Sequence, residues 1–212
     1  MTSTRVPPGV RAVVFDVGET LVDESRAWRR QAELAGISPF TLMAMIGSLI
    51  ERGEDHRHVW RELNVAPPTE PPRIIEADLY PDAVACLQDT MAAGFIVGIA
   101  GNQPAGLESQ LRDAGFEADF IATSTAWGVV KPSQEFFERT IAATTLSPAE
   151  ILYVGDRLDN DVLPARRAGM HTALLVRGPW GHLHSRRDEA ALADLRISTL
   201  SELAQELRLA WP

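Results

Sequence analysis

Short, unbroken apolar runs recur along this chain, and they constrain its fold more than any other feature. A run without alternating polar residues is typical of a strand that is buried on both faces, as strands are in a parallel sheet. We therefore predict a parallel sheet built from five such segments. The runs cover residues 12–15, 95–100, 120–123, 151–154 and 172–176.

Glycine precedes three of the later runs in the same way. Gly94, Gly115 and Gly169 each follow an alanine at the end of a helical pattern. Glycine is favoured just past a helix because it takes a positive φ without a steric penalty at Cβ. The repeated order of helix, glycine and strand predicts an α/β fold with a doubly wound parallel sheet.

Residues 23–79 interrupt this order. They carry apolar side chains at helical spacing, contain no strand candidate, and close with the proline-rich segment 67–72, which predicts an extended connector. A new helix is expected to start at Tyr80-Pro81-Asp82, because proline and an acid suit a first turn. We therefore expect a core made of residues 1–22 and 80–212, with residues 23–79 inserted as a small helical cap.

Composition excludes several classes of protein. The 212 residues are 45% hydrophobic, too apolar for a disordered chain, yet no apolar run approaches the roughly 20 residues of a membrane span. The formal charge of −9 argues against a nucleic-acid partner, which would favour a basic surplus. Residues 1–9 lack the apolar stretch of a secretion signal, and the single cysteine, Cys86, permits no internal disulfide. We expect a cytoplasmic protein without a membrane partner, and we expect Cys86 to be buried.

Polar residues at the ends of the predicted strands mark the candidate site. Asp16 follows the first run, Asn102 the second and Asp156 the fourth, and Lys131 lies in the loop after the third. Ligands bind beside the carboxyl ends of strands in an open α/β sheet, so these residues can converge. Asp16 and Asp156 offer the carboxylate oxygens that Mg²⁺ prefers. Lys131 would offset the charge of an aspartate crowded against a phosphate.

This order of motifs resembles the haloacid dehalogenase (HAD) superfamily of aspartate-nucleophile hydrolases, in its subgroup with a helical cap inserted after the first motif. The resemblance extends from Val13 to about Leu203. It implies a Rossmann-like core in which Asp16 and Lys131 are catalytic, a Mg²⁺ site and a substrate-binding site. The implied metal ligands are Asp16, the main-chain carbonyl of Gly18, Asp156 and Asp161, and the implied substrate-binding residues are Gly101, Asn102 and Lys131.

Three positions depart from the family pattern. Phosphatases of the family carry a second Asp two residues after the nucleophile, where this chain has Gly18. They carry Ser or Thr before the asparagine of the second motif, where this chain has Gly101, and glycine where it has Glu19. Loss of a general acid–base lowers a rate by about 10²–10⁴, so proton transfer is expected to limit turnover, and Gly18→Asp is expected to raise it by about 10-fold or more.

The resemblance implies a Mg²⁺-dependent phosphatase that acts on a small phosphorylated metabolite through an aspartyl-phosphate, with turnover attenuated by these losses. Two alternatives stay open: a catalytically impaired binding or regulatory protein of the same fold, and a hydrolase of a carbon–halogen or carbon–phosphorus bond. Dehalogenases of the superfamily work without a metal. The Asp156 motif indicates a metal site and therefore argues against a dehalogenase. The phosphonate-cleaving relatives use a lysine from the cap, and residues 23–79 contain none.

Two His-x-His pairs raise the question of a zinc site. No cysteine or third histidine lies at ligand spacing from either pair, so we predict histidines in surface loops. The pairs are His56 with His58 and His182 with His184. Trp127, just before the lysine motif, is expected either to line the site or to pack in the core.

Overall fold

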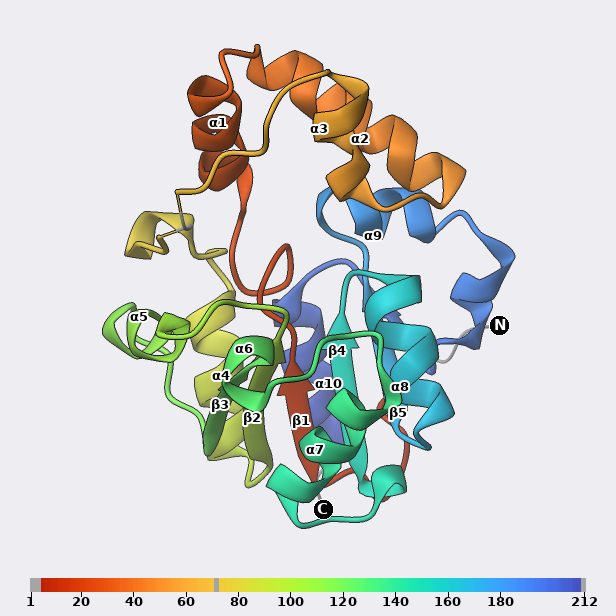
Figure 1. The fold of residues 1–212 in the computed structure, drawn as a ribbon. Helices are drawn as coiled ribbons and strands as arrows, with labels where there is room; N and C mark the ends of the chain where they lie inside the picture. Colours follow the sequence, from red (N-terminus) through yellow and green to blue (C-terminus); the bar gives the residue numbers. More distant parts are fainter. Residues whose placement is uncertain (1–4, 71–72, 211–212) are drawn as a thin grey trace.

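The centre of the molecule is a six-stranded sheet in which every pair of neighbouring strands is parallel (Figure 1). The computed structural model describes residues 5–70 and 73–210. The strands, in the spatial order β3-β2-β1-β4-β5-β6, confirm the doubly wound α/β fold. Their bounds are β1 (Ala12–Phe15), β2 (Ile96–Gly101), β3 (Phe120–Thr123), β4 (Ile151–Gly155), β5 (His171–Leu175) and β6 (Leu195–Ile197).

All five predicted runs form strands, and β6 is an additional edge strand. It pairs only with β5 among the described strands, and its three residues alternate between buried and exposed. Too short to stand out as a run, it was not expected from the sequence. The glycines Gly94, Gly115 and Gly169 take φ values of 90°, 99° and 87°, as predicted for residues that end helices.

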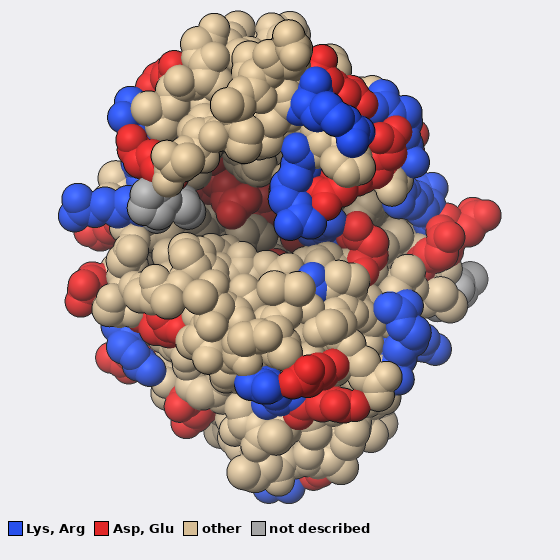
Figure 2. All heavy atoms as spheres, in the orientation of Figure 1, with Lys and Arg blue, Asp and Glu red and all other residues tan. Residues whose placement is uncertain are grey.

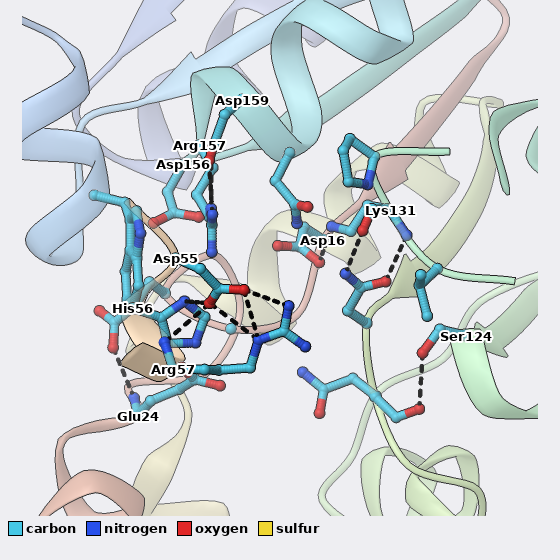
Figure 3. Close-up of a pocket in the computed structure, with 18 of the residues that line it drawn as sticks. Asp16, Glu24, Asp55, His56, Arg57, Ser124, Lys131, Asp156, Arg157 and Asp159 are labelled. Atoms are coloured by element: carbon cyan, nitrogen blue, oxygen red, sulfur yellow. Dashed lines mark hydrogen bonds and ion pairs between the residues drawn. The ribbon is translucent and has the colours of Figure 1, made fainter. Parts of the chain in front are cut away.

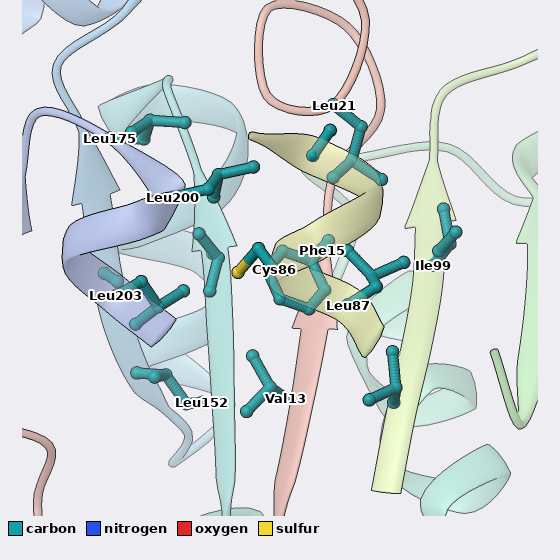
Figure 4. Close-up of a cluster of buried hydrophobic side chains, with 14 of the residues drawn as sticks. Val13, Phe15, Leu21, Cys86, Leu87, Ile99, Leu152, Leu175, Leu200 and Leu203 are labelled. Carbon is teal, nitrogen blue, oxygen red and sulfur yellow. The ribbon is translucent and has the colours of Figure 1, made fainter. Parts of the chain in front are cut away.

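Successive residues of β1 pack into two hydrophobic cores on opposite faces of the sheet, which explains why the run has no polar position. Val13 and Phe15 pack with α4 (Ala83–Ala92), α5 (Leu107–Asp113) and α10 (Leu200–Ala210). Ala12 and Val14 pack with α7 (Gln134–Thr144) and α8 (Leu163–Arg167) on the opposite face. Figure 4 shows the first core, where Cys86 lies among aliphatic side chains as expected.

A helical segment stands over the carboxyl ends of the strands (Figure 1). Its bounds are α1 (Ser25–Leu34), α2 (Pro39–Arg52), the short turn η1 (His56–His58), α3 (Val59–Glu62) and the turn η2 (Glu76–Asp78). These helices enclose a hydrophobic cluster that includes Leu42, Ile46 and Leu49, and Trp180 from α9 (Gly178–His184) completes it. The predicted connector 67–72 has no regular structure over residues 67–70, and Pro71 and Pro72 lie outside the described residues.

Two local predictions had different outcomes. The helix expected at Tyr80-Pro81-Asp82 begins at Ala83, directly after Asp82. The Asp82 carboxylate does not cap this helix and accepts hydrogen bonds from Arg177 and from the Leu200 N–H instead. Trp127 packs against Phe136, with ring centroids 5.4 Å apart. It ends α6 (Ser124–Trp127).

The surface-loop prediction was wrong for His184, which is 2% exposed in α9. Its Nδ1 accepts a hydrogen bond from the Leu158 N–H. Leu158 begins η4 (Leu158–Val162), a single wide helical turn, and the remaining short turns are η3 (Pro148–Glu150) and η5 (Asp188–Leu192). Among the described helices none is by itself long and apolar enough to cross a membrane; α1 and α2 pass that test only as a pair, bent by 112°.

Two glycine-to-alanine substitutions are predicted to change stability in opposite directions. A Cβ on Gly98 in β2 would lie 2.2 Å from the Phe120 ring, so Gly98→Ala should lower the free energy of unfolding by about 1–3 kcal/mol. A Cβ on Gly47 in α2 meets nothing within 4 Å, so Gly47→Ala should raise it by about 0.5–1 kcal/mol. Urea unfolding measures both, and a stable Gly98→Ala protein would contradict the packing described here.

Candidate active site

The site lies at the point where the strand order reverses. β1 and β4 are neighbours with Phe15 beside Val154, so the next residues of both strands emerge together at the same edge of the sheet. The Asp16 N–H donates to the Val154 carbonyl at 2.9 Å, which fixes the start of the loop. Asp156 follows one residue after the end of β4. Two carboxylates therefore meet at the topological switch point, where such sheets bind ligands.

Lys131 is the only lysine of the chain, and its ammonium group joins the acidic residues of the site. Its Nζ lies 2.6 Å from Asp16 Oδ1 and 2.6 Å from Asp161 Oδ1, and its side chain is 1% exposed. Burial alone would lower the pKa of this amine, but the two carboxylates outweigh burial and hold the pKa well above its ordinary value. Lys131 is therefore a permanent positive charge between two aspartates.

Asn102, predicted to bind substrate, holds the backbone of Lys131. The Asn102 side-chain amide donates to the Lys131 carbonyl at 3.0 Å and accepts from the Lys131 N–H at 2.7 Å. The ammonium group also lies 5.5 Å from the centroid of the Tyr153 ring and 5.9 Å from that of Phe136. These contacts fix both ends of the lysine, so its charge is directed at Asp16.

Three aspartates crowd the end of the sheet. Oxygens of Asp16, Asp156 and Asp161 lie within 4.8 Å of one another. Loss of hydration raises the pKa of Asp161 to about 6, against the lowering effect of Lys131. Loss of hydration, with the charges of Asp161 and Asp16, raises the pKa of Asp156 well above its usual range, and Asp156 Oδ2 has no hydrogen-bond partner. One ammonium group does not neutralise three carboxylates, so a divalent cation fits this donor set.

Gly101 lacks a side chain where the site has no room for one. A Cβ at this position would lie 2.7 Å from Asp16 Oδ1, the oxygen that is paired with Lys131. Similarly, a Cβ on Gly155 would lie 2.5 Å from the Asp161 carboxyl carbon. The second motif therefore lacks its usual hydroxyl at a position where any side chain would collide with the Asp16 carboxylate in its present place.

Gly18 lines the same cleft, and the space next to its Cα is filled by a residue that the sequence did not single out. A Cβ on Gly18 would lie 2.6 Å from Glu24 Oε1. Glu24 immediately precedes α1. Loss of hydration, with the charges of Glu19 and Asp16, raises the pKa of the Glu24 carboxyl to about 7. The expected gain from Gly18→Asp therefore requires that Glu24 first move.

Glu19 holds the loop that leads to Glu24. Its φ is +53°, a conformation that favours glycine, which agrees with glycine being usual here in the family. Its carboxylate accepts hydrogen bonds from the Tyr80 hydroxyl at 2.7 Å and from the Glu24 N–H at 3.0 Å. Both carboxylate oxygens of Glu19 are thus engaged in positioning the chain.

The cleft has a volume of about 700 Å³ and is lined by residues of the sheet edge, the helical segment and α9. Figure 2 shows it as a hollow with acidic atoms at its floor and basic side chains beside its mouth. Figure 3 shows that Asp55, His56 and Arg57 line the same cleft as Asp16 and Lys131. Sequence reasoning missed Asp55 and Arg57 as lining residues, because neither stands at the end of a strand.

His56 is also not the surface-loop histidine that was predicted. Its ring stands edge-on to Trp180, with centroids 5.2 Å apart, and its side chain is 22% exposed. Loss of hydration lowers the pKa of His56 to about 4, so the ring is neutral at physiological pH. Arg157 also stacks on Trp180, with its guanidinium carbon 5.0 Å from the centroid of the Trp180 ring. Of the described residues, only the three aspartates form a cluster suited to a metal ion.

An α/β sheet with aspartates and a lysine at its switch point is typical of the HAD class of hydrolases. Comparison with known proteins gives the same class. A profile of the haloacid dehalogenase-like hydrolase family matches residues 10–169, and the chain belongs to that family. It is 26% identical over 234 residues to glyceraldehyde 3-phosphate phosphatase of Methanopyrus kandleri, covering 94% of this chain and 97% of the relative.

Two solved structures share the fold. An L-2-haloacid dehalogenase from Xanthobacter autotrophicus has a TM-score of 0.70 at 20% identity, over 94% of this chain and 98% of the other. A HAD hydrolase of Bacillus subtilis bound to magnesium has a TM-score of 0.65 at 19% identity, over 93% of this chain and 98% of the other. With the family match over residues 10–169, the protein is a hydrolase of the HAD superfamily.

Removing the lysine charge is predicted to destabilise the protein. Lys131→Met keeps the length of the side chain but leaves two buried carboxylates without their cation. In the presence of a chelator it should lower the free energy of unfolding by about 3–5 kcal/mol, measured by urea denaturation. Arg208→Met is the matched control, since it breaks an exposed ion pair with Asp89 and should change stability by less than about 1 kcal/mol. Equal effects would contradict the assigned role of Lys131.

Proposed function

We propose that the protein is a Mg²⁺-dependent phosphatase of a small phosphorylated metabolite, acting through an aspartyl-phosphate on Asp16. The observation that carries the proposal is the convergence of Asp16, Lys131 and Asp156 on one cleft, with the buried Asp161 bound to Lys131. The sequence relative named as a glyceraldehyde 3-phosphate phosphatase supports a small phosphate ester as the substrate. A cleft of about 700 Å³ is large enough for such a substrate.

The donor set supports Mg²⁺ as the cofactor. Asp16, Asp156 and Asp161 present carboxylate oxygens close together, and the unpartnered Asp156 Oδ2 is a buried acceptor without a donor. We assign the metal to these residues and to the Gly18 carbonyl. Bound there, Mg²⁺ would neutralise the negative charge of the phosphate and the carboxylates together. The structural neighbour bound to magnesium is consistent with this assignment.

The chain's own groups prepare Asp16 for attack. Lys131 occupies Asp16 Oδ1, which leaves Oδ2 as the nucleophilic oxygen, and an ionised carboxylate needs no base. The new bond joins Asp16 Oδ2 to phosphorus, and the bond from phosphorus to the ester oxygen breaks. Lys131 also places a fixed positive charge where the transferring phosphoryl group gains negative charge. Water then hydrolyses the acyl phosphate and restores the Asp16 carboxylate.

The helical segment supports selection of the substrate and exclusion of water. Trp28 and His56 of this segment, with Trp180 of α9, give one side of the cleft an apolar, neutral surface, and Arg57, paired with Asp55, lines the same cleft. A phosphoryl enzyme is protected when water is excluded from it, which a lid over the strand ends would achieve. We therefore assign residues 23–79 as the cap of the enzyme.

Metal binding is predicted to depend on Asp156. Titration of the protein with Mg²⁺ should raise its thermal unfolding midpoint, because the folded state binds the cation and the unfolded chain does not. Asp156→Asn should abolish most of this rise. Asp113→Asn changes an exposed aspartate of α5 and should retain it. An unchanged Mg²⁺ response in Asp156→Asn would overturn the metal assignment.

Phosphatase activity is predicted to depend on Asp16. With Mg²⁺ present, the protein should release phosphate from p-nitrophenyl phosphate and from small alkyl phosphates, including glyceraldehyde 3-phosphate. Asp16→Asn should reduce this by about 10³-fold or more, because an amide is a poor nucleophile. No turnover on any phosphate ester, together with retained Mg²⁺ binding, would support the alternative of a binding protein. Halide release from a 2-haloacid without metal would support a dehalogenase.

A further inference from the structure

The proposed reaction needs a group that moves protons, and Gly18 has none to offer. An alkyl leaving oxygen departs as a strong base unless it is protonated as the bond to phosphorus breaks. Water that attacks the acyl phosphate must lose a proton in turn. The acid that serves both steps has to lie in the cleft beside Asp16, within reach of the leaving oxygen and of the attacking water.

The structure fills the volume of the missing side chain with a carboxyl group from elsewhere in the chain. The position of a Cβ on Gly18 would be 2.6 Å from Glu24 Oε1, 2.8 Å from Cδ and 3.2 Å from Oε2. The whole Glu24 carboxyl group therefore lies where the side chain of residue 18 would begin. Glu24 lines the same cleft as Asp16 (Figure 3).

Apart from Asp156, whose unpartnered Oδ2 we assign to the metal, the other carboxylates of the cleft are engaged by nearby donors. Asp16 and Asp161 bind Lys131, and Glu19 accepts hydrogen bonds from Tyr80 and from the Glu24 backbone. The remaining acids are paired with nearby arginines, Glu54 with Arg52, Asp55 with Arg57 and Asp159 with Arg157. Glu24 differs from all of these, since the partner of its carboxyl group is the Trp28 side chain, an uncharged donor.

The fold holds Glu24 in this place from two directions. Its backbone N–H donates to Glu19 Oε1 at 3.0 Å, and its carbonyl accepts from the Trp28 N–H at 2.9 Å as α1 begins. The side chain thus projects from a fixed helix start, at the junction between the sheet and the helical segment. A change in the position of α1 would carry the carboxyl group toward or away from Asp16.

We propose that Glu24 is the proton-transfer residue of this enzyme and takes the place of the side chain that Gly18 lacks. In the first step Asp16 Oδ2 bonds to phosphorus, the ester bond breaks, and the Glu24 carboxylic acid gives its proton to the leaving oxygen. In the second step the Glu24 carboxylate takes a proton from the attacking water, and the bond between phosphorus and Asp16 breaks. Glu24 ends protonated, as it began, and inorganic phosphate is released. This inference rests on the proposed function.

The decisive test is Glu24→Gln, which keeps the shape of the side chain and removes its proton. With an alkyl phosphate, kcat should fall by about 10²-fold or more, because the leaving oxygen needs the acid. With p-nitrophenyl phosphate the first step should survive, so a burst of nitrophenolate equal to the enzyme concentration should precede slow turnover. The accumulated phosphoenzyme can be measured by mass spectrometry. Glu33→Gln, an exposed glutamate of α1, is the matched control and should behave like the native protein.

A second pair of variants guards against simple misfolding of Glu24→Gln. Gly18→Asp alone is crowded by Glu24 and should give no gain, whereas Glu24→Ala removes the crowding together with the acid. Combining the two places a carboxyl group in the same volume from residue 18. The double variant should exceed Glu24→Ala by about 10-fold or more on alkyl phosphates. Rescue of this kind would not arise if Glu24 only supported the helix start.

The outcomes separate this inference from the function on which it rests. Native turnover with an unaffected Glu24→Gln variant would overturn the role of Glu24 and leave the phosphatase intact. Loss of the Mg²⁺-induced thermal shift in Glu24→Gln would overturn it in another way, by making Glu24 a metal ligand. Absence of turnover and of a phosphoenzyme in the native protein, with Asp16→Asn identical to it, would overturn the proposed function itself.

Discussion

The pairing of one buried ammonium group with two aspartates is the interaction on which the site depends. Lys131, from the loop between α6 and α7, binds Asp16 at the end of β1 and Asp161 in η4. Breaking such a pair leaves a buried charge without compensation, so the pairing has to form if the strands are to end where they do. The same cation fixes one oxygen of Asp16 and leaves the other for chemistry. Stability and function therefore rest on the same contacts.

Three carboxyl groups of the site lie against glycine residues, which leave room for them. Gly101 admits Asp16, Gly155 admits Asp161, and Gly18 admits Glu24, each at a distance that a Cβ would not allow. Compared with the family pattern, Gly18 and Gly101 each lack a functional side chain. In the structure, the absence of these side chains leaves space that an acidic group occupies. Whether a side chain is missing or displaced depends on what occupies its volume, and at Gly18 that occupant is another carboxyl group.

The helical segment is joined to the core by more than its two connections. Trp180 of α9 lies in the hydrophobic cluster of α1–α3, and Arg187 donates a hydrogen bond to the Ile50 carbonyl at 2.5 Å. The cleft is consequently bounded on one side by a contact between the segment and α9. On the other side stands the loop from Gly18 to Glu24, which carries both the start of α1 and an acid of the site. The position of the segment and the chemistry of the site are thus linked through Glu24.

Much of this protein is determined by the sequence itself. A strand buried on both faces has to be apolar throughout, so β1 to β5 were predictable from runs such as Ala12–Phe15, and their order placed Asp16, Lys131 and Asp156 at one edge. The edge strand β6, with three residues, was too short to form such a pattern. His184 is buried beside a hydrogen-bond partner, the Leu158 N–H, that lies 26 residues away in the sequence. Glu24 is only six residues from Gly18, but its place beside Gly18 depends on how the chain turns after Leu21 and not on any spacing. Local composition determines which segments are buried, and only tertiary packing determines which side chain fills a particular volume.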